Sequence, residues 1–268
     1  MIEKLNVKLF IFAAYKAELY FIFDKNKLTK ISQISKFDVY VNNEKDLYVV
    51  ISGSSYCNMS YAVAYLAGAN ILDKQSILVN IGIAGAKDYK KSSIFLINKI
   101  THKFYKKKYY PANIVDNNFN VAELMTIIDP GHYEDNKIMD MEAYDFFMSS
   151  LKFVNYEQIF ILKIISDNSS SDLANFKKES LSVLINDKAS EIIKFLTDIK
   201  IFFNDYYAEF VLSNYYHKII DKFHFTHSEK NKLAKFLLKL EANSDSKTLS
   251  LLEKLVSKNE LIKLMSDV

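Results

Sequence analysis

The stretch Ser76–Ala86, with the sequence SILVNIGIAGA, shows most clearly how the chain folds. Its first part, Ser76–Ile81, is a short, mainly apolar run that is typical of a strand buried on both faces of a sheet. The following Gly82–Ala86 predicts a turn, where glycine lets a ligand approach the backbone because it has no Cβ atom. The turn lacks the third spaced glycine and the acidic partner of a dinucleotide-binding fingerprint.

Further apolar runs lie on both sides of this stretch and predict strands at Val7–Ala13, Leu47–Ser52, Ile94–Ile97, Val121–Ile128 and Gln158–Ile165. Between them, residues at helical spacing predict helices at Tyr15–Phe23, Ser55–Ala67, Lys137–Leu151 and about Leu173–Phe202. Strands that alternate with helices in this way predict an α/β domain with a mixed, mostly parallel central sheet flanked by helices.

Polar or glycine residues follow four of the predicted strands: Glu18, Gly53, the turn Gly82–Ala86, and the pair Ser166–Asp167. In parallel sheets, ligands bind beyond the carboxyl ends of the strands. We therefore expect these four segments to meet at one edge of the sheet.

The chain changes character near Asn204, so we expect two domains, residues 1–203 and a helical C-terminal extension, residues 204–268. Helices are predicted at Asp205–Lys222, Ser228–Glu241 and Ser246–Ser266. The second carries an apolar stripe of Leu233, Phe236, Leu237 and Leu240 opposite its lysines. Such a basic amphipathic helix can bind a membrane or a partner. Packing within its own domain is the favoured interpretation.

Composition excludes several classes of protein. Half of the 268 residues are hydrophobic and a quarter are charged, which excludes wholesale disorder. Cys57 is the only cysteine, so there is no disulfide framework and no cysteine-based zinc site. The five histidines include no HExxH motif, and we expect neither a metal nor an organic cofactor.

All 35 basic residues are lysine, and the net charge is +3. Without arginine, bidentate recognition of phosphate or guanine is absent, so we expect no nucleic-acid partner. The cluster Lys106–Lys108 is interpreted as an exposed loop. No segment reaches the roughly 20 apolar residues of a membrane span, and no signal peptide is recognised, so we expect a soluble cytoplasmic protein with no membrane partner.

Four segments of the chain resemble, in order, the purine nucleoside phosphorylase and nucleosidase superfamily: Ala14–Glu18 (AYKAE), Val79–Ala86 (VNIGIAGA), Met139–Phe147 (MDMEAYDFF) and Ile164–Asn168 (IISDN). The resemblance spans roughly residues 6–200 and is closest to the methylthioadenosine/S-adenosylhomocysteine nucleosidases. It implies a nucleoside phosphorylase-like fold, hydrolysis of the N-glycosidic bond of a purine nucleoside or thionucleoside, no cofactor, and a homodimer or higher homo-oligomer.

Glu142 is predicted to lie at a helix start near the strand ends, where its carboxylate can accept two hydrogen bonds from the vicinal diol of a ribose. The alternative is a solvated glutamate favoured by the helix dipole. The resemblance implies that Glu142 binds the ribose hydroxyls and that Met141 packs against the sugar. Asp140, which stands where the family has a longer glutamate, is also expected to bind substrate.

Asp167 follows an apolar strand, where desolvation favours the neutral carboxyl, which can then protonate a purine at N7. The resemblance assigns Asp167 this general-acid role, and Ser166 is expected to orient it. The alternative is that Asp167 or Ser169 caps the following helix.

Glu18 distinguishes hydrolysis from phosphorolysis, because hydrolysis needs a base that activates water on the sugar face opposite the leaving group. The resemblance assigns this role to Glu18; otherwise it is an exposed glutamate on a short helix. A phosphorylase needs a phosphate cradle, for which lysines, backbone amides, Ser54 and Ser55 are a poorer substitute than arginines. A phosphorylase, or a non-catalytic nucleoside-binding or scaffold protein, is the alternative.

The resemblance also implies that Ala84 and Gly85 lie against the sugar and base. Several positions depart from the family: Ile83 replaces serine, Ala86 replaces glycine, Lys163 replaces arginine, and Thr126–Asp135 is shortened. In that shortened segment, His132 or Tyr133 is a candidate to stack on the base, and the alternative is that the segment is a surface loop.

Overall fold

The computed structural model describes residues 6–54, 57–129, 133–168, 183–208, 214–242, 252 and 257–266. The chain divides into two compact units, one of residues 6–203 and one of residues 1–5 and 204–268. We call them the α/β unit and the helical unit.

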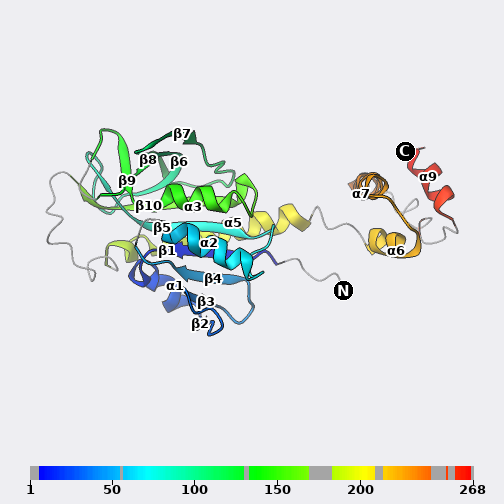
Figure 1. The fold of residues 1–268 in the computed structure, drawn as a ribbon, viewed down its shortest axis with the longest axis horizontal. Helices are drawn as coiled ribbons and strands as arrows, with labels where there is room; N and C mark the ends of the chain where they lie inside the picture. Colours follow the sequence, from blue (N-terminus) through cyan, green and yellow to red (C-terminus); the bar gives the residue numbers. More distant parts are fainter. Residues whose placement is uncertain are drawn as a thin grey trace. The chain divides into compact units, whose positions relative to one another are not determined.

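Four parallel strands form the centre of the α/β unit: β1 (Leu9–Ala13), β4 (Leu47–Ile51), β5 (Ile77–Ala86) and β10 (Ile159–Asn168). β1 pairs with β4 and β5, and β5 pairs with β10, in each case in parallel (Figure 1). All four carboxyl ends therefore lie at the same edge of the sheet, as expected from the sequence.

The remaining strands make the sheet mixed. β6 (Ile94–His102), β8 (Asn120–Thr126) and β9 (Lys137–Asp140) connect β10 back to β5, so that these five strands close a ring. β3 (Asp38–Val41) and β2 (Thr29–Lys30) extend the other edge beyond β4, and β7 (Tyr105–Tyr109) pairs with β6. This architecture confirms the predicted fold class.

Helices bury both faces of the central strands. Two short helices follow β1, namely η1 (Lys16–Leu19) and α1 (Tyr20–Lys25). α2 (Asn58–Gly68) and α3 (Ala143–Ser150) lie side by side, and the Ser60 hydroxyl donates to the Asp145 carbonyl at 2.9 Å (Figure 1). The 3-10 helix η2 (Tyr156–Gln158) precedes β10, and α5 (Ala189–Ala208) is the longest helix of the described residues.

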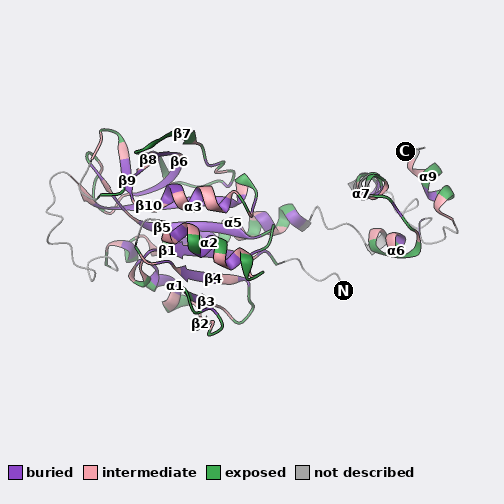
Figure 2. Cartoon of the chain, in the orientation of Figure 1, coloured by how far each residue is buried: buried purple, intermediate pink, exposed green. Residues whose placement is uncertain are grey.

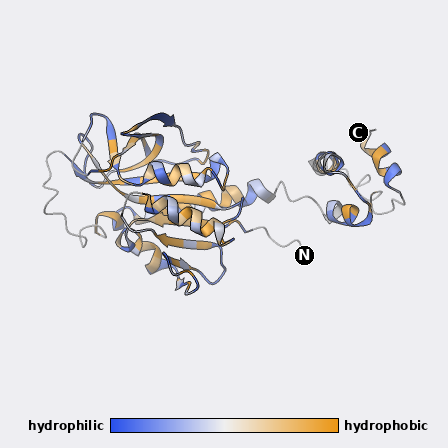
Figure 3. Cartoon of the chain, in the orientation of Figure 1, coloured by the Kyte–Doolittle hydropathy of each residue, from blue (hydrophilic) through white to orange (hydrophobic). Residues whose placement is uncertain are grey.

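Aromatic side chains show how the two faces are covered. Phe12 of β1 packs against Phe146 of α3 at 5.3 Å between ring centroids, and Phe160 of β10 packs against Phe195 and Phe203 of α5. Because both faces are buried, the central strands β1, β4, β5 and β10 are mainly apolar rather than alternating (Figures 2 and 3).

The predicted turn at Gly82–Ala86 is wrong, because these residues are the second half of β5. Gly82 pairs with Lys163 and Ala86 with Asn168 of β10, while Gly85 also pairs with Met139 of β9. Pairing on both sides holds this glycine-containing segment in a strand, although its local composition favours a turn.

Two other local predictions are also wrong. Lys137–Leu151 is not one helix: Lys137–Asp140 forms β9, in which Ile138 and Met139 are buried between β5 and β8, and only Ala143–Ser150 is helical. Lys106–Lys108 lies in β7 rather than in a loop, with all three side chains exposed.

The helical unit contains α6 (Asn214–Lys222), α7 (His227–Ala242) and α9 (Lys258–Ser266). The predicted stripe on α7 is buried, in a cluster that includes Ile219, Phe225 and Leu261. This burial confirms that the stripe packs within its own domain.

The helix expected to begin at Asp205 instead continues α5, which runs through Asn204 to Ala208. The first parts of the predicted helices Ser55–Ala67, Leu173–Phe202 and Ser246–Ser266 lie outside the described residues. Among the helices that are described, none combines the length and apolarity that crossing a membrane requires.

Candidate active site

Glu18 lies at the carboxyl end of β1, on the 3-10 helix η1. It is 2% exposed, and its carboxylate accepts hydrogen bonds from the backbone N–H groups of Tyr15, at 2.8 Å, and Ile83, at 3.1 Å. Burial raises the pKa of Glu18, while the Tyr15 bond, the charge of Lys163 and the Ile83 bond oppose the rise. The interpretation of Glu18 as an exposed glutamate is therefore wrong.

Lys163 is the buried cation of this region, with a side chain that is 1% exposed. Its ammonium group forms an ion pair with Asp140 at 2.9 Å. Burial alone would lower the pKa of Lys163, but the carboxylates of Asp140, Glu142 and Glu18 outweigh burial and raise it. Lys163 therefore remains charged in the middle of three acidic groups.

Asp140 is fully enclosed at the end of β9. Besides the ion pair, it accepts a hydrogen bond from the Thr126 hydroxyl at 2.7 Å and another from the Ala143 backbone N–H at 2.8 Å. Its side chain is 0% exposed. Asp140 was expected to bind substrate, but the partners of its carboxylate are the protein groups Lys163, Thr126 and Ala143.

Glu142 is the N-cap residue of α3, which places it at a helix start near the strand ends. Burial raises its pKa to about 7, with further increases from the charges of Asp140 and Glu18, whereas Lys163 lowers it. Glu142 is itself half-buried, and these charge effects group it with Glu18, Asp140 and Lys163. Met141, between Asp140 and Glu142, is half-buried.

Asp167 lies near the end of β10, just after an irregularity between Ile165 and Asp167. The buried Ser166 hydroxyl contacts one carboxylate oxygen, and the Tyr133 hydroxyl donates to the other at 2.5 Å. Burial and the bond to Asp167 raise the pKa of Tyr133 far above its usual range, so its hydroxyl keeps its proton.

Gly85 makes this arrangement possible. A Cβ atom at Gly85 would lie only 2.6 Å from Asp167 Oδ2 and 2.8 Å from Tyr133 Cε1. A Cβ atom at Gly82 would lie 3.1 Å from Glu18 Oε1 and 3.3 Å from Lys163 Nζ. The two glycines of β5 therefore let both groups of polar side chains approach the strand.

One short segment of β5 brings the acidic side chains together. Glu18 contacts Gly82 and Ile83, Asp167 pairs with Gly85, and Gly85 also pairs with Met139, which precedes Asp140. Gly82 and Gly85 are about 10 Å apart along a strand, which is comparable to the length of a nucleoside.

Some site residues were missed or cannot be placed. Lys163 and Thr126 were not predicted as site residues, although a single lysine within the apolar run QIFILKII is a signal for a buried charge. Tyr15 contacts Ser54 through its hydroxyl, whereas Ser55, His132 and Ser169 lie outside the described residues. The described residues contain no group of three or more side chains suited to a metal ion.

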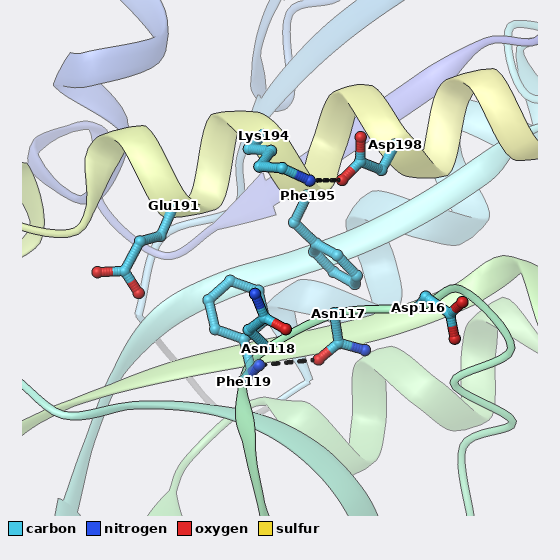
Figure 4. Close-up of a pocket in the computed structure, with 8 residues that line it drawn as sticks. All are labelled: Asp116, Asn117, Asn118, Phe119, Glu191, Lys194, Phe195 and Asp198. Atoms are coloured by element: carbon cyan, nitrogen blue, oxygen red, sulfur yellow. Dashed lines mark hydrogen bonds and ion pairs between the residues drawn. The ribbon is translucent and has the colours of Figure 1, made fainter.

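A separate hollow of about 480 Å³ opens between α5 and the segment before β8 (Figure 4). It is lined by Asp116, Asn117, Asn118, Phe119, Glu191, Lys194, Phe195 and Asp198. Lys194 and Asp198 form an ion pair at 2.6 Å, and none of the predicted site residues lines the hollow.

Known proteins resemble this chain in structure rather than in sequence. No family model and no curated protein sequence matches it. Among solved structures, an MTA/SAH nucleosidase has a TM-score of 0.57 at 11% identity, covering 72% of this chain and 96% of that one. The chain has the nucleosidase fold.

Two further nucleosidases show the same likeness. The 5′-methylthioadenosine/S-adenosylhomocysteine nucleosidase of Campylobacter jejuni has a TM-score of 0.54 at 16% identity, covering 73% of this chain and 98% of its own. The 5′-methylthioadenosine nucleosidase of Arabidopsis thaliana has a TM-score of 0.56 at 15% identity, covering 71% and 96%. The nucleosidase fold places the ends of β1, β5 and β10 at one edge, where the acidic cluster lies.

Proposed function

We propose that this protein is an N-ribosyl hydrolase that cleaves the glycosidic bond of a purine nucleoside or thionucleoside. The observation that carries the proposal is the group formed by the buried Glu18 and Lys163 and the half-buried Glu142, with Asp167 of β10 paired to Gly85 of β5. Glu18 and Glu142 supply a base and a diol-binding group, and Asp167 supplies an acid.

In the proposed reaction, Asp167 gives its proton to N7 of the base while the bond between C1′ and N9 breaks. The sugar acquires oxocarbenium character, and Glu142 in its ionised form holds the ribose hydroxyls. Glu18 takes one proton from a water molecule, whose hydroxyl bonds to C1′. The products are the free base and the free sugar, and proton exchange with solvent restores both carboxyl groups.

The other predicted site residues take supporting roles in this proposal. Met141, Ala84 and Gly85 contact the sugar and base, and Ser166 orients Asp167. Asp140 was expected to bind substrate, but with a fully buried side chain we assign it to holding Lys163 in place. Lys163 in turn balances the charges of Glu18 and Glu142.

The substrate class is a purine nucleoside with or without a 5′-thio substituent, such as methylthioadenosine or S-adenosylhomocysteine. The test is base release from a panel of purine nucleosides in phosphate-free buffer, followed by chromatography. Release without phosphate, with free sugar as product, supports hydrolysis. Strict dependence on phosphate, with sugar 1-phosphate as product, contradicts it, and binding without turnover indicates a nucleoside-binding protein.

We also propose that the protein forms a homodimer or a higher homo-oligomer. The α/β unit exposes several large aromatic side chains, among them Tyr61, Phe104, Tyr105 and Tyr110. Contiguous exposed apolar surface marks association sites, so these side chains are the candidates for an interface. Sedimentation at micromolar concentration tests this, and a purely monomeric species contradicts it.

A further inference from the structure

The two oxygens of the Asp167 carboxylate both face hydroxyl groups of the protein itself. Ser166, the preceding residue, contacts Oδ1, and Tyr133, from the segment between β8 and β9, donates to Oδ2 at 2.5 Å. The second contact joins residues that are 34 positions apart in the chain, so it depends on the tertiary fold.

The Tyr133 ring is held against the backbone of β5. Its Cε1 atom would be 2.8 Å from a Cβ atom at Gly85, so the ring lies where the side chain of another residue would project. The same absent Cβ atom would be 2.6 Å from Asp167 Oδ2. Tyr133 and the outer oxygen of Asp167 therefore share the space that Gly85 leaves open.

The chemistry of this contact opposes the role proposed for Asp167. The Tyr133 hydroxyl donates to the carboxylate and so takes one acceptor position of Oδ2. N7 of a purine is an acceptor, so it can hydrogen-bond to Asp167 only through a proton on the carboxyl group. The base would then lie within hydrogen-bond distance of Asp167, as the Tyr133 oxygen does in this structure. Because Ser166 already contacts Oδ1 and Tyr133 contacts Oδ2, a base that binds at Oδ2 competes with the Tyr133 hydroxyl for the space beside that oxygen.

We propose that Tyr133 determines specificity by competing with the purine base for Oδ2 of Asp167, so that only a base that displaces its hydroxyl binds productively. This inference rests on the proposed function. It differs from a stacking role, because the hydroxyl lowers affinity for the base while the ring remains beside Gly85.

The test compares wild type with Tyr133→Phe, which removes the hydroxyl and keeps the ring. We expect the KM for methylthioadenosine to fall by about 3- to 10-fold, with kcat within about twofold of wild type, because a competing hydrogen bond of ordinary strength is lost. An unchanged or increased KM overturns the proposal.

A second measurement separates this proposal from the proposed function. Adenine is titrated calorimetrically into both proteins, and Tyr133→Phe should bind it about 3- to 10-fold more tightly. If wild type releases no base but the difference in adenine affinity is found, the hydrolase proposal fails and the role of Tyr133 stands. If base is released and adenine binds both proteins equally, Tyr133 does not compete.

Tyr156→Phe is the matched control. The Tyr156 hydroxyl accepts a hydrogen bond from the Tyr110 backbone N–H at 2.9 Å, before β10 rather than at its carboxyl end. The control removes one tyrosine hydroxyl from the same unit. Its KM and adenine affinity should equal those of wild type, and an equal gain in both variants would overturn the assignment to Tyr133.

Discussion

At the scale of single residues, Asp167 is the side chain on which the proposed chemistry depends most directly. Asp167→Asn keeps the shape of the group and can still contact Ser166 and Tyr133, but it cannot protonate a base. Turnover should fall by roughly 100- to 10,000-fold, the usual effect of losing an acid–base group. The measurement is kcat for base release from methylthioadenosine.

Asp38→Asn is the control for this substitution, since Asp38 is an exposed residue of β3 and pairs with Lys30. It should leave kcat unchanged. Wild-type turnover in Asp167→Asn would remove the general-acid role from the proposed mechanism.

The stability of the protein should depend on the ionisation of Glu142, whose pKa is raised from 4.5 to about 7. Between these two values the folded state binds more protons than the unfolded state, so the contribution of Glu142 to stability declines as pH rises and is lost above about pH 7. Glu142→Gln cannot ionise. Relative to wild type, the variant should gain roughly 1–3 kcal/mol in free energy of unfolding between pH 5 and pH 8.

Urea unfolding at the two pH values measures this difference. Glu44→Gln, at an exposed position, is the control for the loss of one carboxylate. If the two variants respond alike to pH, burial does not perturb Glu142 as described.

At the scale of elements, β5 requires glycine at position 85. Gly85→Ala places a Cβ atom 2.6 Å from Asp167 Oδ2 and 2.8 Å from Tyr133 Cε1, so at least one of these side chains must move. We expect a loss of about 1–3 kcal/mol in stability and a loss of base release of at least about tenfold.

Gly68→Ala is the matched control, because no atom lies within 4 Å of the added Cβ at the end of α2. It should retain full activity and gain up to about 1 kcal/mol, since alanine favours the helix more than glycine does. Full activity of Gly85→Ala would show that the positions of Asp167 and Tyr133 are not critical.

Lys163 of β10 and Asp140 of β9 form a buried ion pair. Replacing only one of the two residues should destabilise the protein more than replacing both. Lys163→Met leaves the buried Asp140 carboxylate without its cation, and we expect a loss of about 3–5 kcal/mol. The double variant Lys163→Met with Asp140→Asn should recover part of this loss, because the uncompensated charge is gone. Urea unfolding of the two single variants and the double variant gives the coupling energy, and additive effects would contradict a direct ion pair.

At the scale of the whole molecule, all the candidate site residues belong to the α/β unit. In the helical unit, Leu237 is 0% exposed within a cluster of apolar side chains. Leu237→Ala should destabilise that unit by about 2–5 kcal/mol, as in other cores, and leave base release unchanged. Hydrogen exchange resolved by peptides measures the first effect, and a steady-state assay measures the second. Loss of activity would show that the helical unit contributes to the reaction.

Local sequence patterns determined where the buried strands, the buried face of α7 and the polar ends of the strands lie in the chain. Apolar runs such as Leu47–Ser52 and Gln158–Ile165 mark strands buried on both faces, because burial on two sides demands apolar side chains throughout. The apolar stripe of α7 marks a buried helix face for the same reason. The polar residues after β1 and at the end of β10 mark the candidate site, since parallel strands direct their carboxyl ends to one edge.

The tertiary structure alone decided the partners of these residues. Gly82–Ala86 is a strand because β10 and β9 pair with it, although its composition favours a turn. Lys163 pairs with Asp140, which is 23 positions away in the chain, and Tyr133 donates to Asp167, which is 34 positions away. Strand pairing and the neutralisation of buried charge join residues that are distant in sequence, so no local pattern contains this information.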